Sequence, residues 1–220
     1  LVLECTGVFR SETGAAKHLH AGAKKVLISA PAKGQIKTVV LGVNENILQP
    51  SDLIVSNASC TTNCLAPVTY IMHQSFDLVQ AFVSTIHAYT ADQNLHDGPH
   101  KSDMRRARAA AQNMVPTTTN AGEALAEVMP EIGDSVQASA IRVPVICGSL
   151  IEMNAIVKKG VTADEVNQVF REAASNRFKN ILEYTESPLV SSDIIGNQHS
   201  AIFDALLTQV SGKMVKVNQQ

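Results

Sequence analysis

A cysteine between a strand-like and a helix-like segment is the first feature of this sequence that could do chemistry. Cys60 lies in SNASCTTNCLAPV, residues 56–68, with Ser59 before it and Thr61 and Thr62 after it. The free N–H groups and partial positive charge of a helix start stabilise a thiolate, so we expect the pKa of this thiol to be lowered. The alternative is a cysteine packed as a small apolar side chain, but the polar neighbours favour a nucleophile.

A histidine 27 positions downstream is the natural partner of this thiol. In QAFVSTIHAYT, a period of two places Ala81, Val83, Thr85 and His87 on one face of a predicted strand. A neutral imidazole beside a thiol can take and return a proton, which is worth about two to four powers of ten in rate. A lone histidine on a strand is usually structural, so this hypothesis depends on the pairing with Cys60.

Arginine and threonine side chains are candidates for binding anions. Arg142 interrupts the apolar segment AIRVPV, where a guanidinium needs an anionic partner or ligand. Arginine binds phosphate through paired hydrogen bonds, and threonine hydroxyls add donors. Two such groups beside one thiol would suit a phosphorylated substrate and a second anion. We expect no metal site, because Gly98 and Pro99 break the helix that would align His96 with His100.

The elements that must position these residues fall into two groups. Strands are predicted at 1–7, 24–31, 38–44 and 53–59, with a helix at 11–23. Apolar strands alternating with helix indicate a mostly parallel sheet with covered faces. Beyond Cys60 we expect helices at 60–76, within 103–114 and at 162–178, and strands at 80–90, 135–145, 148–159, 200–207 and 213–217. The second group predicts an α+β domain, and we place the boundary between residues 59 and 60.

Composition narrows the class of protein. The chain has 220 residues, 45% of them hydrophobic, and a net charge of −2, so no basic field is available for nucleic acid or an acidic membrane surface. No apolar run is long enough to span a bilayer, and no secretory signal is recognised. Four cysteines fit a reducing compartment, which predicts a cytoplasmic location. Because the sequence starts at Leu1 within a strand-like run, we expect it to be a piece of a longer protein.

Several segments together resemble one enzyme family over essentially all 220 residues. SNASCTTNCLAP, HAYTADQ, RRARAAAQNMVPTTT, IRVPV and YTESPLVSSD, in this order and spacing, resemble the phosphorylating glyceraldehyde-3-phosphate dehydrogenases. The resemblance implies an α/β fold: a partial Rossmann-type dinucleotide-binding domain, of which residues 1–59 are the C-terminal part, and an α+β catalytic domain with a mixed or antiparallel sheet at 60–220, incomplete at its C-terminus. The family's glycine-rich turn and its closing nicotinamide-orienting asparagine are not in this sequence.

The resemblance also implies a reaction. In glycolysis, glyceraldehyde 3-phosphate is oxidised and phosphorylated to 1,3-bisphosphoglycerate by a cytoplasmic homotetramer that uses NAD, with NADP as the alternative cofactor. The Cys60 thiolate would attack the aldehyde, His87 would take the proton as hydride leaves, and inorganic phosphate would attack the resulting thioester. Pro99 lies where NAD-preferring members tend to keep proline, which favours NAD. The partners expected are therefore the two phosphate compounds and further copies of the chain, and neither nucleic acid nor membrane.

By position, the resemblance assigns the remaining site residues. The site for the substrate's own phosphate would be formed by Thr90, Asp92 and Arg142. The site for the attacking phosphate would be formed by Ser59, Thr61, Arg106 and Thr119, with Asn120 where the family usually has glycine. The strand ends that approach the cofactor would carry Thr6, Gly7 and Ser29. Asn120 would either add a contact to the attacking-phosphate site or crowd it.

Three other functions are alternatives. An erythrose-4-phosphate dehydrogenase would share the cysteine and histidine, although Thr90 favours the glyceraldehyde enzyme. A Cys/His hydrolase or acyltransferase would need no nucleotide and would require an asparagine or aspartate to orient the histidine. A truncated chain could also serve a non-catalytic role, because the cofactor half is incomplete in this sequence.

Overall fold

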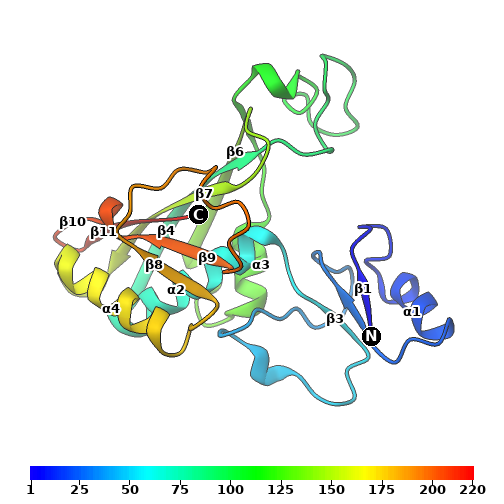
Figure 1. The fold of residues 1–220 in the computed structure, drawn as a ribbon, viewed down its shortest axis with the longest axis horizontal. Coiled ribbons are helices and arrows are strands. Elements are labelled where there is room, and N and C mark those ends of the chain that lie inside the picture. The colour runs from blue at the N-terminus through cyan, green and yellow to red at the C-terminus, as the bar shows by residue number, and fades with distance from the viewer.

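The protein is described by a computed structural model that covers residues 1–133 and 135–220, together with the backbone of residue 134. The chain forms a three-stranded sheet near its N-terminus and an eight-stranded sheet in the remainder. Figure 1 shows the N-terminal unit to one side of a larger body, into which the chain passes through α2. The observed α/β architecture confirms the predicted fold class.

The N-terminal sheet is parallel, as the alternation of elements predicted. Its strands β1 (Val2–Glu4), β2 (Val26–Ile28) and β3 (Ile54–Ser56) lie in the order β1-β2-β3. Helix α1 (Glu12–His20) buries Ala15 against Val26 and Ile28. The hydroxyl of Ser11 accepts a hydrogen bond from the Gly14 N–H at 3.1 Å and so caps the start of α1.

The predicted strand at residues 38–44 is wrong. Thr38 alone pairs with Ser56, after which the chain turns through Gly42, whose φ of 82° favours glycine. The Asn44 amide holds this turn, because its oxygen accepts from the Val40 N–H at 2.8 Å and its nitrogen donates to the Thr38 carbonyl at 3.0 Å. The 3₁₀ helix η1 (Glu45–Ile47) follows. The apolar run at 38–44 reflected burial, not strand pairing.

The larger sheet is mixed, as expected. Its order is β5-β6-β4-β7-β11-β9-β8, with β10 on β11. β4 runs parallel to β6 and antiparallel to β7, and β8 runs parallel to β9. The strands are β4 (Leu78–Ala88), β5 (Val115–Thr117), β6 (Val136–Val143), β7 (Ser149–Val157), β8 (Leu182–Thr185), β9 (Ala201–Asp204), β10 (Gln209–Ser211) and β11 (Met214–Gln219).

Three helices build the main core with one face of this sheet: α2 (Cys60–Phe76), α3 (Ala121–Val128) and α4 (Ala163–Ser175). Fully buried side chains join the layers, among them Phe170 of α4, stacked on Phe203 of β9 with ring centroids 4.0 Å apart. Burying a side chain of this size contributes about 1.5–3 kcal/mol. Thr162 and Glu165 form a capping box at the start of α4. Short 3₁₀ turns occur at η3 (Gly133–Ser135) and η4 (Ala205–Leu207).

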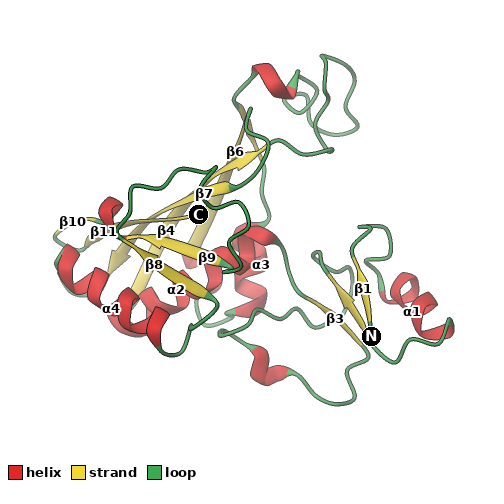
Figure 2. Cartoon of the chain, in the orientation of Figure 1, coloured by secondary structure: helices red, strands yellow, loops and turns green.

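The segment 90–113 is mostly loop and projects beyond the ends of β6 and β7 (Figure 1, Figure 2). The helix expected within 103–114 is reduced to η2 (Ala110–Gln112). The Asp103 carboxylate accepts from the backbone N–H groups of Arg105, at 2.8 Å, and Arg106, at 3.3 Å. This side-chain contact favours a turn over a helix. No helix in the described part of the chain is long and apolar enough to cross a membrane.

Candidate active site

The turn between β3 and α2 presents Cys60 at the first position of the helix. Ala58 within this turn is buried and has a left-handed φ of 58°, which costs about 1–2 kcal/mol for a residue other than glycine. The Ser56 hydroxyl holds the turn, accepting from the Ala58 N–H at 3.1 Å and donating to the Ala30 carbonyl at 2.8 Å. Sequence reasoning missed Ala58, because an alanine gives no signal of positive φ.

Ser59 caps the helix that carries the thiol. Its hydroxyl accepts from the Thr62 N–H at 3.1 Å, and the Asn63 amide donates to the Ser59 carbonyl at 2.9 Å. A helix start fixed in this way directs its free N–H groups towards the region of Cys60. The Ser59 hydroxyl, predicted to contact an anion, is thus engaged within the helix start.

The thiol and the imidazole are in contact. Cys60 Sγ lies 3.6 Å from His87 Nε2, at the end of β4. The hydrogen bond from His87 is the main cause that lowers the pKa of Cys60, assisted by Thr61 and opposed by burial. One helical turn further, burial raises the pKa of the Cys64 thiol to about 12. The structure therefore separates one exposed thiol with a lowered pKa from one buried thiol with a raised pKa.

The pair opens into a pocket of about 300 Å³. Besides Cys60 and His87, its walls include the Gly148–Ser149 turn before β7 and the loop before β9, which contributes Asn197 and His199. Both of these side chains are anchored to Glu183: the Asn197 amide donates to it at 2.7 Å, and His199 Nδ1 lies 3.2 Å from it. Sequence reasoning missed Asn197 and His199, since no local spacing links them to Cys60. A larger hollow of about 720 Å³ between the end of α2 and α4 contains no cysteine or histidine.

Strand pairing brings Arg142 to His87. The two residues are register partners across the parallel strands β4 and β6. Arg142 Nη1 lies 2.8 Å from His87 Nδ1 and donates to the Ala88 carbonyl at 2.9 Å. Burial is the main cause that lowers the pKa of Arg142, followed by the charge of Arg106, while Cys60 and Asp92 act in the opposite direction. A half-buried guanidinium with positive charge nearby is suited to an incoming anion.

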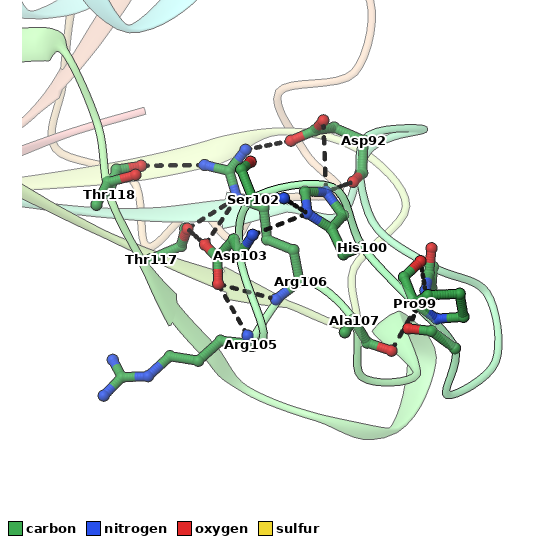
Figure 3. A network of polar contacts seen from close by, with 12 residues as sticks. Asp92, Pro99, His100, Ser102, Asp103, Arg105, Arg106, Ala107, Thr117 and Thr118 are labelled. Carbon is green, nitrogen blue, oxygen red and sulfur yellow. Dashed lines mark hydrogen bonds and ion pairs between the residues drawn. The ribbon is translucent and has the colours of Figure 1, made fainter.

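Arg106 anchors the projecting loop to β5, as Figure 3 shows. Its Nε donates to the Thr117 hydroxyl at 2.8 Å, its Nη2 donates to the Thr118 carbonyl at 3.2 Å, and its Nη1 forms an ion pair with Asp92. The Thr117 hydroxyl donates to Asp103 at 2.7 Å and is the main cause that lowers the pKa of that carboxyl group. The structure thus links the predicted site residues Arg106 and Asp92, which the resemblance had assigned to different anions.

His100 has a structural position in this network (Figure 3). Its Nδ1 accepts from the N–H groups of Ser102, at 3.2 Å, and Asp103, at 3.0 Å, and its Nε2 donates to the Asp92 carbonyl at 3.0 Å. With both ring nitrogens engaged, His100 is a loop-forming residue. Among the described residues, no three His, Cys, Asp or Glu side chains are grouped to hold a metal ion.

Three predicted site residues lie at element ends without a hydrogen bond to Cys60 or Arg142 in the described structure. Thr90 is exposed just after β4, and its carbonyl accepts from the Gln93 N–H. Thr119 accepts from the Ala121 N–H at 3.2 Å, at the start of α3. Asn120 is exposed at the N-cap of α3, where its side chain forms no cap hydrogen bond.

Thr6, Gly7 and Ser29 lie just beyond the carboxyl ends of β1 and β2, where open α/β sheets bind ligands. The buried residue Glu4 contacts Thr6 and Ser29: its carboxylate accepts from the Thr6 N–H at 2.8 Å, and its backbone carbonyl accepts from the Ser29 N–H at 3.0 Å. His18 Nε2 lies 2.7 Å from the same carboxylate. Gly7 has a φ of 73°, and a Cβ at this position would meet no atom within 4 Å apart from those of its chain neighbours. An open backbone at this edge fits the approach of a nucleotide. Sequence reasoning missed Glu4.

Comparisons with known proteins agree with this geometry. Residues 59–219 match the family described as glyceraldehyde 3-phosphate dehydrogenase, C-terminal domain. The chain is 50% identical over 217 residues to the glyceraldehyde-3-phosphate dehydrogenase of Mycobacterium leprae and 51% identical over 217 residues to that of Mycobacterium avium. It is 51% identical over 218 residues to that of Kitasatospora aureofaciens. Each alignment covers 99% of this chain, which spans about 64% of the length of the first two relatives and 65% of the third.

Proposed function

Because the chain belongs to the glyceraldehyde-3-phosphate dehydrogenase family, we propose that it carries the reactive centre of an NAD-dependent enzyme that oxidises and phosphorylates glyceraldehyde 3-phosphate in glycolysis. The observation that carries this proposal is the contact of Cys60 Sγ with His87 Nε2 at 3.6 Å, at a capped helix start. A thiol with a lowered pKa and an adjacent imidazole is the arrangement that covalent aldehyde chemistry requires.

In the first half-reaction the Cys60 thiolate forms a bond to the aldehyde carbon, and the carbonyl oxygen takes a proton from solvent to become the hydroxyl of a hemithioacetal. His87 Nε2 then removes the proton of that hydroxyl while the carbon gives up its hydrogen as hydride, so that the C–O double bond reforms and a thioester remains on Cys60. NAD, when bound, supplies the hydride acceptor for this oxidation. Thr6, Gly7 and Ser29 would hold the cofactor along the carboxyl edge of β1 and β2. NAD over NADP remains part of the proposal, supported by Pro99.

In the second half-reaction, inorganic phosphate attacks the thioester carbon and Cys60 leaves as a thiolate. We assign this phosphate to Arg106 with Thr61, Thr119 and Asn120, and Ser59 acts by capping the helix. The substrate's own phosphate is assigned to Arg142 with Thr90 and Asp92. The ion pair of Arg106 with Asp92 supports a single continuous anion region. An anion at Arg106 would then compete with Asp92 for the guanidinium.

We also propose that residues 1–59 and 60–220 act as cofactor and catalytic parts of a cytoplasmic homotetramer. The face of the large sheet opposite α2, α3 and α4 exposes apolar side chains, including Phe82 at 70% and Met214 at 53%. Apolar side chains in this number on one sheet face indicate a protein interface. We expect further copies of this chain to cover this face, because membership of the family favours a homotetramer. Four free cysteines are compatible with a reducing compartment.

Steady-state kinetics of the complete enzyme test the proposal. Reduction of NAD should require glyceraldehyde 3-phosphate and inorganic phosphate, and it should be slower with erythrose 4-phosphate. Cys60→Ser should abolish turnover, while Cys64→Ser should retain it, because the buried thiol is protonated. Full activity of Cys60→Ser would refute the thiol assignment, and a preference for erythrose 4-phosphate would move the enzyme to the alternative function.

A further inference from the structure

Three polar atoms behind the catalytic pair form a closed triangle. His87 Nδ1 lies 2.7 Å from the Ala88 carbonyl oxygen and 2.8 Å from Arg142 Nη1, and Arg142 Nη1 lies 2.9 Å from the same oxygen. All three distances are within hydrogen-bond range. The triangle lies on the side of the imidazole opposite Cys60, so it controls which ring nitrogen carries the proton.

The three contacts cannot all be hydrogen bonds at once. A guanidinium only donates and a carbonyl oxygen only accepts. If Nδ1 carries a proton, it donates to Ala88, but it then meets the N–H of Arg142. If Nδ1 is bare, it accepts from Arg142, but its lone pair then meets the Ala88 oxygen. Either proton position leaves one mismatched contact, so the position of Arg142 decides between the two tautomers of His87.

We propose that Arg142 is a positioning residue that couples binding of the substrate's phosphate to the tautomer of His87, an inference that rests on the proposed function. In the empty site Arg142 faces the bare Nδ1, and the proton is on Nε2, which donates to Cys60 Sγ. A phosphate monoester offers the guanidinium two charged acceptors and draws it away from His87. Nδ1 then carries the proton and donates to Ala88, and the lone pair of Nε2 faces the reacting atoms.

The change is balanced, because the imidazole has one proton in both states: Nε2 gives its proton to solvent and Nδ1 takes one. The empty-site tautomer stabilises the thiolate by donating to it. The anion-bound tautomer can act as a base towards the hemithioacetal hydroxyl. The phosphate of the substrate therefore contributes to the rate of the reaction as well as to binding, because it releases the base.

The ring nitrogens of His87 provide a direct test by ¹⁵N NMR of the labelled chain, with His87→Asn to assign the signals. The probe is glycerol 3-phosphate, which has the phosphate but no aldehyde; glycerol in salt of equal ionic strength is the control. We expect the ratio of the Nδ1–H to the Nε2–H tautomer to rise at least about tenfold with glycerol 3-phosphate only. Arg142→Leu should show the Nδ1–H tautomer without any probe. Arg108→Leu is the matched control, since Arg108 pairs with the exposed Asp97, and it should behave as the wild type.

Two results in the wild type would overturn the coupling: the Nδ1–H tautomer of His87 predominates in the empty site, or glycerol 3-phosphate leaves the tautomer ratio unchanged. Neither result depends on the folding of Arg142→Leu. Turnover adds a second criterion. The ratio of kcat with glyceraldehyde 3-phosphate to kcat with unphosphorylated glyceraldehyde should fall in Arg142→Leu, and a ratio equal to that of the wild type would count against the coupling. Full turnover of Cys60→Ser would refute the proposed function, but it would leave the tautomer result for His87 unchanged. The two failures are therefore distinguishable.

Discussion

Alkylation of the two cysteines of α2 should differ by a large factor that follows from their surroundings. The pKa of Cys64 is raised to about 12, and the pKa of Cys60 is lowered from its ordinary value of 9.0. At pH 7 a thiol with a pKa of about 12 is ionised in roughly one molecule in 10⁵, and one with a pKa of 9 in roughly one in 10². The thiolate fraction of Cys60 should therefore exceed that of Cys64 by at least about 10³. The lower intrinsic nucleophilicity of the thiolate with the lower pKa offsets part of this factor, while burial of Cys64 adds to the difference in rate.

Iodoacetamide labelling measured by peptide mass spectrometry checks this expectation. The rate at Cys60 should rise with pH, with an inflection at the pKa of that thiol, because only the thiolate reacts. The inflection should lie below pH 9.0, since the pKa is lowered. In His87→Asn the first cause of the lowering is removed, so the inflection should move upward. Gln80→Asn, an exposed change on the same strand, is the control and should leave the inflection in place.

Two results would refute this reasoning. Equal labelling rates at Cys60 and Cys64 in the native protein would show that the helix start and the imidazole do not separate the two thiols. An inflection at Cys60 that is the same with and without His87 would show that the 3.6 Å contact does not favour the thiolate.

Three further predictions concern stability. Phe170→Ala should lower the free energy of unfolding by about 3–5 kcal/mol in urea denaturation, because the ring is fully buried; a loss below about 1 kcal/mol would contradict the packing. Thr162→Ala should cost about 1 kcal/mol by removing the cap of α4, and Thr162→Ser should restore most of it. The Thr6 hydroxyl is the first cause that lowers the pKa of Glu4, so the stabilisation from Glu4 exists above its ordinary pKa of 4.5 and is lost as pH falls through the lowered value. Melting temperature against pH should therefore fall less steeply at acid pH in Glu4→Gln, and parallel curves would contradict this.

Local features of the site could be predicted because each depends on near neighbours. The N-cap of Ser59 and the capping box of Thr162 with Glu165 are formed within three residues of sequence. The face of β4 that ends in His87 follows from a period of two, and its inner positions Ala81, Val83 and Thr85 are buried. The helix start that the motif around Cys60 predicted is present for the same reason.

Other local patterns misled, because tertiary contacts or side-chain hydrogen bonds outweighed propensity. The apolar run at 38–44 is buried but turns on the amide of Asn44. The arginine- and alanine-rich run at 103–114 has strong helix formers, yet Asp103 holds its start as a turn and Arg106 is committed to Asp92 and β5. Differences in helix propensity of a few tenths of a kcal/mol per residue are smaller than the free energy contributed by several hydrogen bonds to charged groups.

The sequence by itself determined the thiol, its capped helix start, the strand face that carries the imidazole and the presence of an arginine in an apolar strand. Tertiary structure decided what those residues do to one another. Arg142 reaches His87 across 55 positions of sequence, because the register of β4 on β6 places them side by side. That register is fixed by the burial of whole strands on α2 and α3, which no short segment encodes.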